Sequence, residues 1–194
     1  MLSFPEEVRS GLKVVALPEL QETSDLPCDT GSDPDKLEAE FGPQKTVKLD
    51  LVHPGWNSKT GKWSPAASAI EARAREARLW LRSLGEQAGD GDKDIVVVTH
   101  GGYLHYFTED WHGHGKFTGT GWANTEFRSY EFVDETGRDP NASLVETKES
   151  RVRRRGDEIP LTEAEQRNLR ESAEKEWSDS GFQHGGKTEE TAKL

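Results

Sequence analysis

The sequence predicts an α/β fold with a mostly parallel sheet that is covered by helices on both sides. Three observations predict it. An amphipathic helix begins near Ser64, a β-branched run at residues 95–99 (IVVVT) is apolar on both faces, and the glycine pair Gly101 and Gly102 follows that run. The order helix, turn, buried strand, glycine turn and helix is typical of parallel α/β units.

The composition favours one domain with a peripheral part. A chain of 194 residues is long enough to bury a sizeable core. Hydrophobic residues make up 32% of it and charged residues 31%, and the mean hydropathy is -0.85. Because so polar a chain buries little apolar surface, we expect part of it to stay outside the core.

The charge balance counts against a nucleic-acid partner. The net charge is -11, whereas affinity for nucleic-acid backbones comes largely from clustered lysine and arginine. The one basic run, residues 151–155 (RVRRR), is followed by Asp157 and Glu158, so we interpret it as solvated charge.

The cysteine content and the lengths of the apolar runs indicate the cellular compartment in which the protein is expected. The single cysteine, Cys28, excludes an internal disulfide and a multi-cysteine zinc site, and it is consistent with a reducing compartment. No window reaches the roughly 18 apolar residues of a membrane span, and the N-terminus lacks a signal-peptide pattern. We therefore expect a cytoplasmic protein with no membrane partner.

The first predicted elements are short. Residues 14–17 (VVAL) form a β-branched run between Gly11 and Pro18, which suits a buried strand. A turn-rich acidic stretch follows. A helix is expected at residues 34–41, because Asp33 is a capping residue and Pro34 suits the first helical position.

The helix after Ser64 is the best-marked element. Pro65 stands at its first position, and apolar residues recur at spacings of four, three, four and three: Ile70, Ala74, Ala77, Leu81 and Leu84. Gly85 is expected to end it. The run at 95–99 then predicts a strand buried on both faces, followed by a helix of about two turns within residues 103–111.

The later part of the chain predicts one strand and one helix. Residues 126–133 suit a strand near a sheet edge. Thr162 and Glu165 make a capping-box pattern, and Leu169, Ala173 and Trp177 form a thin apolar stripe. We therefore divide the chain into a domain at 1–133 and a charged extension at 134–194, with one peripheral helix and a disordered tail.

Four of the six histidines lie in the stretch THGGYLHYFTEDWHGHG, residues 99–115: His100, His105, His112 and His114. Their spacing matches none of the metal signatures with strong spacing rules. No metal is predicted, and a metal-binding protein stays the less favoured alternative.

His100 stands apart from the other histidines because of its position. It lies at the carboxyl end of the predicted strand, where open α/β sheets place their ligands. The two glycines after it allow close backbone approach, and a following helix presents unpaired N–H groups to an anion. We expect a phosphate or carboxylate ligand, the alternative being a histidine that only bonds a neighbouring carbonyl.

The motif VVVTHGGYLHYFTEDW resembles the second conserved block of the histidine phosphatase superfamily, the phosphoglycerate mutase-like proteins, and looks closest to fungal members. The motif LPELQE, which ends at Glu22, is similar to an earlier block of that family. The helix after Ser64 and the strand in GWANTEFRSYEF also sit where the family has them. The resemblance covers roughly residues 1–133.

The resemblance implies a three-layer α/β sandwich and site residues that act on a small-molecule phosphomonoester without cofactor or metal. His100 matches the histidine that stabilises the transferring phosphoryl group, and the amide of Gly101 lies beside it as a substrate contact. Glu22 matches the acid that protonates the leaving oxygen. Such groups suit phosphoryl transfer, since they surround the equatorial oxygens with hydrogen-bond donors.

The sequence departs from the family at the nucleophile. It contains neither an Arg-His-Gly motif nor the serine-proline-leucine-x-arginine block of the family. The resemblance therefore implies an N-terminally incomplete domain. Hydrolysis of a phosphomonoester and non-catalytic binding of a phosphate or a partner both stay open.

Overall fold

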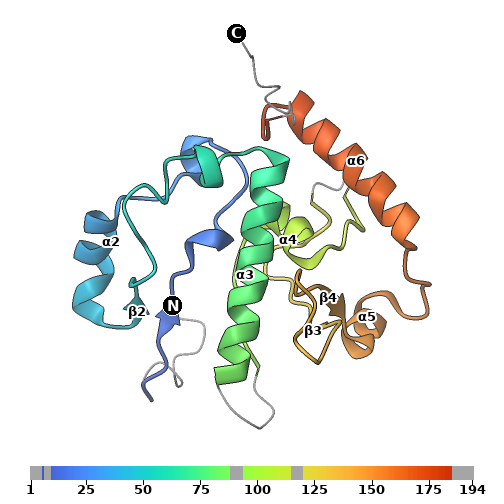
Figure 1. Ribbon diagram of the computed structural model, residues 1–194, viewed down its shortest axis with the longest axis horizontal. Coiled ribbons are helices and arrows are strands. Elements are labelled where there is room, and N and C mark those ends of the chain that lie inside the picture. Colours follow the sequence, from blue (N-terminus) through green and yellow to red (C-terminus); the bar gives the residue numbers. More distant parts are fainter. Residues whose placement is uncertain (1–5, 7–9, 88–93, 115–119, 185–194) are drawn as a thin grey trace.

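A computed structural model describes residue 6 and residues 10–87, 94–114 and 120–184. The long helix α3 (Ala67–Gln87) runs through the middle of the molecule (Figure 1). Most of the chain that precedes α3 lies on one side of it, and the segments after residue 120 lie on the other. Helix α4 (Gly101–Thr108) packs directly against α3.

The N-terminal side holds a very small sheet. Strand β1 (Val14–Val15) pairs in parallel with β2 (Val47–Lys48), so that Val14 lies opposite Val47. The strand predicted at 14–17 therefore exists, but it is shorter than predicted. It is also not buried, since Val14 is 50% exposed and Val15 37%.

Short helices connect these strands. Helix α2 (Pro34–Phe41) has the bounds that the sequence predicts, with Asp33 preceding it and Pro34 in its first turn. Single 3₁₀ turns occupy four further segments: Pro18–Leu20, Pro27–Asp29, Gly42–Gln44 and Gly61–Trp63.

The predicted apolar stripe of α3 is confirmed at four of its five positions. Ile70, Ala74, Ala77 and Leu81 are buried, whereas Leu84 is 37% exposed. The four buried residues form one core cluster with aromatic residues of α4 and the following turn, namely Tyr103, Tyr106, Phe107 and Trp111. The helix continues past Gly85 to Gln87, because a lone glycine lowers helix stability without ending the hydrogen-bond pattern.

The prediction of a doubly buried strand at residues 95–99 is wrong. The segment forms no strand, and Val96 and Val98 are 62% and 82% exposed. Only Val97 packs against the core cluster. Within the described ranges no neighbouring strand pairs with this segment, so the β-branched sequence lacks the hydrogen-bonded partner that burial in a sheet requires.

The fold is mixed α/β, but the described residues contain no large parallel sheet. Besides the β1–β2 pair there is one antiparallel pair, β3 (Tyr130–Phe132) with β4 (Leu144–Glu146), in which Glu131 lies opposite Val145. Strand β3 lies inside the range predicted as a strand, at 126–133. Strand β4 is not predicted by the sequence.

The C-terminal side adds two helices. Helix α5 (Lys148–Arg155) contains the basic run, whose Arg154 forms an ion pair with Glu146 at 2.6 Å. Helix α6 (Glu163–Asp179) begins with the predicted capping box. It is not peripheral as expected, because Ala173 is fully buried and Trp177 packs against the core cluster.

The division at residue 133 stays a prediction, and residues 185–194 of the expected tail lie outside the described residues.

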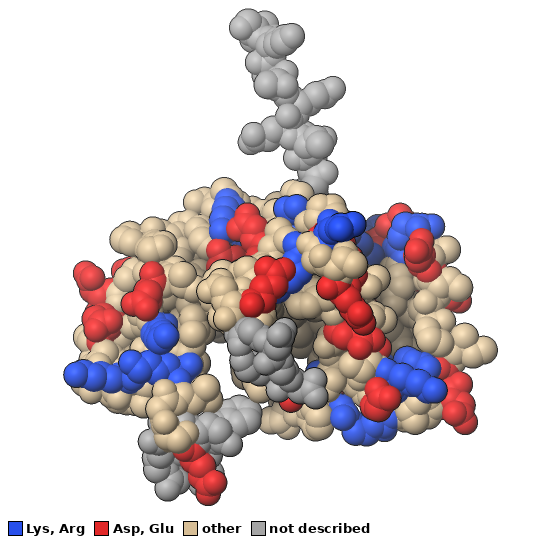
Figure 2. Space-filling view, turned by 60° about the horizontal axis from the view of Figure 1, so that its bottom comes forward, with Lys and Arg blue, Asp and Glu red and all other residues tan. Residues whose placement is uncertain are grey.

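The face in Figure 2 carries basic and acidic side chains side by side over several elements. Among the described residues, no helix is both long enough and apolar enough to cross a membrane.

Candidate functional site

The structure brings together the two residues that the sequence singles out for catalysis. His100 Nδ1 lies 3.8 Å from Glu22 Oε2, although the two residues are far apart in the chain. The Glu22 side chain is 18% exposed and the His100 side chain 55%. The pair is therefore open to solvent on the histidine side and partly covered on the carboxylate side.

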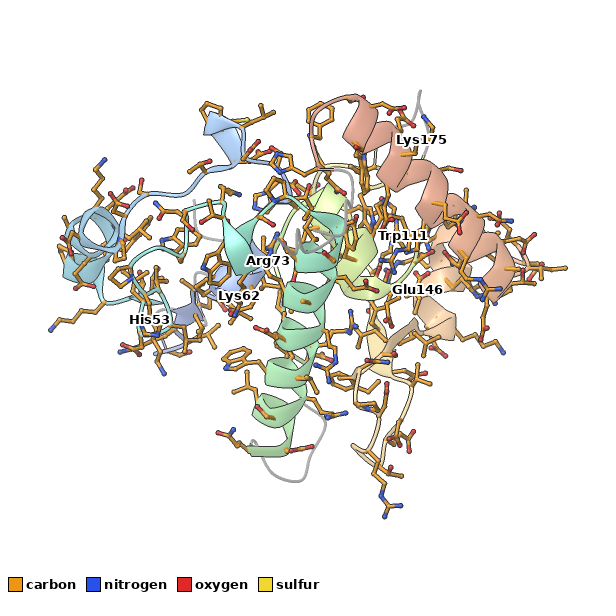
Figure 3. All side chains as sticks on the ribbon, turned by 45° about the horizontal axis from the view of Figure 1, so that its top comes forward. His53, Lys62, Arg73, Trp111, Glu146 and Lys175 are labelled. Atoms are coloured by element: carbon orange, nitrogen blue, oxygen red, sulfur yellow. The ribbon has the colours of Figure 1, made fainter. Side chains whose placement is uncertain are left out.

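Glu22 is positioned by a buried arginine of α3. Arg73 is fully buried, and one of its amino groups donates 2.9 Å hydrogen bonds to the carbonyls of Glu19 and Gln21. Its other amino group donates to the Glu22 carbonyl at 3.4 Å. Burial lowers the pKa of Arg73, which the phenol of Tyr103 and nearby carboxylates partly oppose. Figure 3 shows Arg73 on the side of α3 that faces the N-terminal segment.

His100 is positioned by the start of α4. The Thr99 hydroxyl donates to the Leu20 carbonyl at 2.7 Å, which ties the extended segment to the turn that leads to Glu22. His100 then takes an extended conformation at the N-cap of α4, and its carbonyl accepts the first helical hydrogen bond from Leu104 at 3.0 Å.

The two glycines allow close approach at this point. A Cβ at Gly101 would lie 2.5 Å from the hydroxyl oxygen of Thr120, and a Cβ at Gly102 would lie 3.1 Å from Glu22 Oε1. Any larger residue at Gly101 would push the loop at Thr120 away from the helix. Gly102 likewise lets the Glu22 carboxylate lie against the first turn of α4.

The first turn of α4 presents free donors beside the pair. Within the described part of the chain, the N–H groups of Gly101, Gly102 and Tyr103 have no hydrogen-bond acceptor. Unpaired N–H groups and the positive end of a helix favour an anion. The carboxylate of Glu22 opposes such an anion when it is ionised and donates to it when it is protonated.

Lys59 is a second cation near Glu22 that the sequence analysis missed. Its Nζ donates to the Glu22 carbonyl at 3.3 Å, and the residue is 9% exposed. Burial is the main reason that the pKa of Lys59 is lowered, and the charge of Arg73 adds to it. No sequence signal marks Lys59. The sequence does give a signal for Arg73, because this charged residue interrupts the apolar stripe of α3 between Ile70 and Ala74.

The remaining histidines of the cluster have separate partners. His105 is fully buried, stacks on Trp111 at 5.3 Å between ring centroids, and has a backbone carbonyl oxygen 2.6 Å from each ring nitrogen. His112 lies 3.7 Å from a carboxylate oxygen of Glu158, and His114 lies 3.4 Å from one of Glu176. His53, labelled in Figure 3, is exposed in the segment that follows β2. No group of three potential ligands that could hold a metal ion occurs among the described residues.

A surface cleft between α3, α4 and α6 lies away from the Glu22–His100 pair. Its basic side chains are already satisfied. Arg170 binds both carboxylate oxygens of Glu71 at 2.8 and 2.9 Å, and this pairing is the main cause of a raised pKa of Arg170. The other residues that line it are Arg78, His105, Tyr106, Glu109, Trp111, Gln166 and Arg167.

The site thus combines a carboxyl group, an imidazole and free backbone N–H groups at one helix end. These groups can bind an anion and move a proton. In comparisons with known proteins, no family model, no curated protein and no solved structure matches the chain.

Proposed function

We propose that this protein binds a phosphomonoester at the amino end of α4, with Glu22 and His100 as the catalytic positions for its hydrolysis. The amide of Gly101 is the backbone contact to the phosphate. The proposal includes a phosphoglycerate mutase-like three-layer architecture, a cytoplasmic location, and a small molecule as partner. The net charge of -11 supports a small molecule over a nucleic acid.

One observation carries the proposal: Glu22 and His100 lie 3.8 Å apart, beside free N–H groups of a helix. The histidine resembles a phosphoryl-stabilising residue and the glutamate a proton donor. In that arrangement His100 and the Gly101 amide hold the non-bridging oxygens, and a water molecule attacks the phosphorus in line as the bond to the leaving oxygen breaks. Protonated Glu22 gives its proton to the leaving oxygen and regains one from solvent, to which the attacking water loses a proton.

A specific observation also favours the second candidate, phosphate binding without turnover. The guanidinium of Arg73 donates its hydrogen bonds to the backbone carbonyls of residues 19, 21 and 22. It is fully buried and does not face solvent at the site. The sequence contains no Arg-His-Gly motif that could supply both a nucleophile and a phosphate-binding arginine.

Two measurements on the same variants separate these candidates. The first is calorimetric binding of inorganic phosphate, and the second is turnover of an aryl phosphate. His100→Ala is expected to weaken phosphate binding about tenfold, because it removes a charge-assisted hydrogen bond. Glu22→Gln is expected to keep binding and to abolish turnover, because an amide cannot give up a proton as a carboxylic acid does.

His53→Ala is the matched control, since His53 is an exposed histidine outside the segments that carry Glu22 and His100. Turnover that is lost in both site variants supports hydrolysis. Saturable phosphate binding that is lost in His100→Ala, with no turnover in the unaltered chain, supports the binding protein. Phosphate affinity unchanged in His100→Ala contradicts both.

A further inference from the structure

Residues 94–100 belong to no helix or strand, and within the described part of the chain their backbone is not paired in a sheet. Residues 95–98 form no backbone hydrogen bond within the described part of the chain. Asp94, Val96, Val98 and His100 of one face are exposed, while on the other face residues 97 and 99 are half-buried against the protein and Ile95 is 41% exposed. A flat, apolar, unpaired edge of this kind is a template for another strand.

The exposed face of this segment is self-complementary. Read along the chain it is acid, valine, valine and histidine. In an antiparallel pairing with a second copy about a twofold axis through Val97, Val96 lies opposite Val98. The same pairing places Asp94 opposite His100 at both ends. Apolar and opposite-charge pairs placed directly opposite each other stabilise a sheet.

Other registers lose this complementarity. A shift by one residue would place the exposed face of one copy on the inner face of the other. A shift by two residues sets Asp94 opposite Val98, or Val96 opposite His100. A parallel, in-register pairing brings Asp94 next to Asp94, and like charges directly opposite each other are destabilising.

We propose that two copies of this chain form a homodimer by antiparallel pairing of residues 94–100, with the twofold axis at Val97. A symmetric dimer uses the same patch on both subunits, which a self-complementary strand provides. The pairing supplies the missing neighbour of residues 95–99 and covers the exposed Val96 and Val98. Because the interface is small, the dimer dissociates on dilution.

The first test is sedimentation velocity of the full chain over a dilution series. The unaltered chain is expected to form a dimer that dissociates on dilution, and Val98→Lys is expected to raise its Kd about tenfold or more, since both copies lose an apolar pair. Val98 is 82% exposed, so the fold of the monomer is unaffected. Ile159→Lys, at an 85% exposed position outside the segment, is the control.

A chain that is monomeric at every concentration overturns the proposal and leaves the edge to a different partner. A dimer that is unchanged by Val98→Lys also overturns it, because its interface then lies elsewhere. The dilution series measures association and not phosphate binding, so failure of the dimer is distinguishable from failure of the proposed function, although both proposals involve His100.

The register has its own tests. Opposite residues in an antiparallel pair lie within disulfide reach, whereas diagonal ones lie roughly 7–8 Å apart. In a Cys28→Ser background, a mixture of Val96→Cys and Val98→Cys chains is expected to cross-link under mild oxidation, and each chain alone much less. Equal cross-linking of one variant with itself overturns the register.

The charge pair is tested by exchange. Asp94→His sets two imidazoles opposite each other and is expected to weaken the dimer, and the double variant Asp94→His with His100→Asp is expected to restore it. A double variant as weak as the single one contradicts the pairing of Asp94 with His100.

Discussion

Two apolar regions flank α4, and the structure treats them in opposite ways. On one side Trp111, Tyr106 and His105 pack with Trp177 of α6, with ring centroids 4.9 to 6.3 Å apart. On the other side, the extended residues 95–98 expose Val96 and Val98. In the sequence the aliphatic run is the more hydrophobic of the two.

The comparison shows that apolar side chains become buried only where a partner surface covers them. The aromatic region meets helix α6, which places Ala173 in the core and packs the partly buried Trp177 against it. The β-branched run can be buried on both faces only as part of a sheet, because its backbone N–H and C=O groups also need partners. We therefore expect the covered region, the aromatic residues packed by α6, to contribute most of the stability of the protein. The open region, residues 95–98, should contribute little.

Removal of Trp177 is the strongest test of the covered region. Trp177→Ala is expected to destabilise the protein by about 3 kcal/mol, because the change leaves a cavity against several aromatic rings. The measurement is urea unfolding, with Lys175→Ala on the exposed face of α6 as the control (Figure 3). A loss of less than about 1 kcal/mol would mean that α6 is peripheral, as the sequence suggested.

Arg73 joins the covered core to the site. Arg73→Met is expected to cost about 3 kcal/mol, since the carbonyls of residues 19 and 21 lose a buried donor. It should also lower turnover of the aryl phosphate, because it displaces Glu22, the proposed proton donor. Arg75→Met on the same helix is the matched control, because the hydrogen bond of Arg75 among the described residues goes to the exposed side chain of Asn141. Equal effects of the two substitutions would contradict the positioning role of Arg73.

His105 makes the covered region sensitive to acid. Burial, the largest contribution, lowers the pKa of His105 below its ordinary 6.5, although the carbonyls of Asp110 and Thr120 oppose the shift. The unfolded chain then binds more protons at this residue than the folded one, so stability is lost as pH falls through about 6.5.

The measurement is urea unfolding at pH 7.5 and pH 5.5. His105→Gln is expected to show a smaller loss between these pH values than the unaltered chain, whereas His53→Gln should show the same loss. An equal loss in the His105 variant would indicate that the two carbonyls hold the ring as an imidazolium in the folded protein.

The smallest effect is expected in the open region. Val98→Thr should change the free energy of unfolding of the monomer by less than about 0.5 kcal/mol, because the side chain is already in solvent. Dilute samples, below the dimer Kd, make this a measurement on the monomer. A loss of more than about 1.5 kcal/mol would show that Val98 is buried in the monomer, which would contradict the comparison of the two regions.

Sequence reasoning succeeded where the signals are local. The bounds of α2 follow from Asp33 and Pro34, and the start of α6 follows from Thr162 and Glu165. It failed at residues 95–99, where the outcome depends on a neighbouring strand. For the site, the position of His100 before the glycine pair indicated an anion ligand, only a resemblance indicated Glu22, and nothing in the sequence indicated Lys59.

The sequence by itself determined α2, the capping box of α6 and most of the buried stripe of α3, because these depend on side-chain spacing and on hydrogen bonds within a few residues. It did not predict α5, and α3 begins at Ala67 rather than at Pro65. Only the tertiary structure decided that Glu22 meets His100, that Arg73 holds the turn before Glu22, and that Trp177 packs against the core. Each of these depends on contacts between distant segments, and no local pattern specifies which surface a side chain will meet.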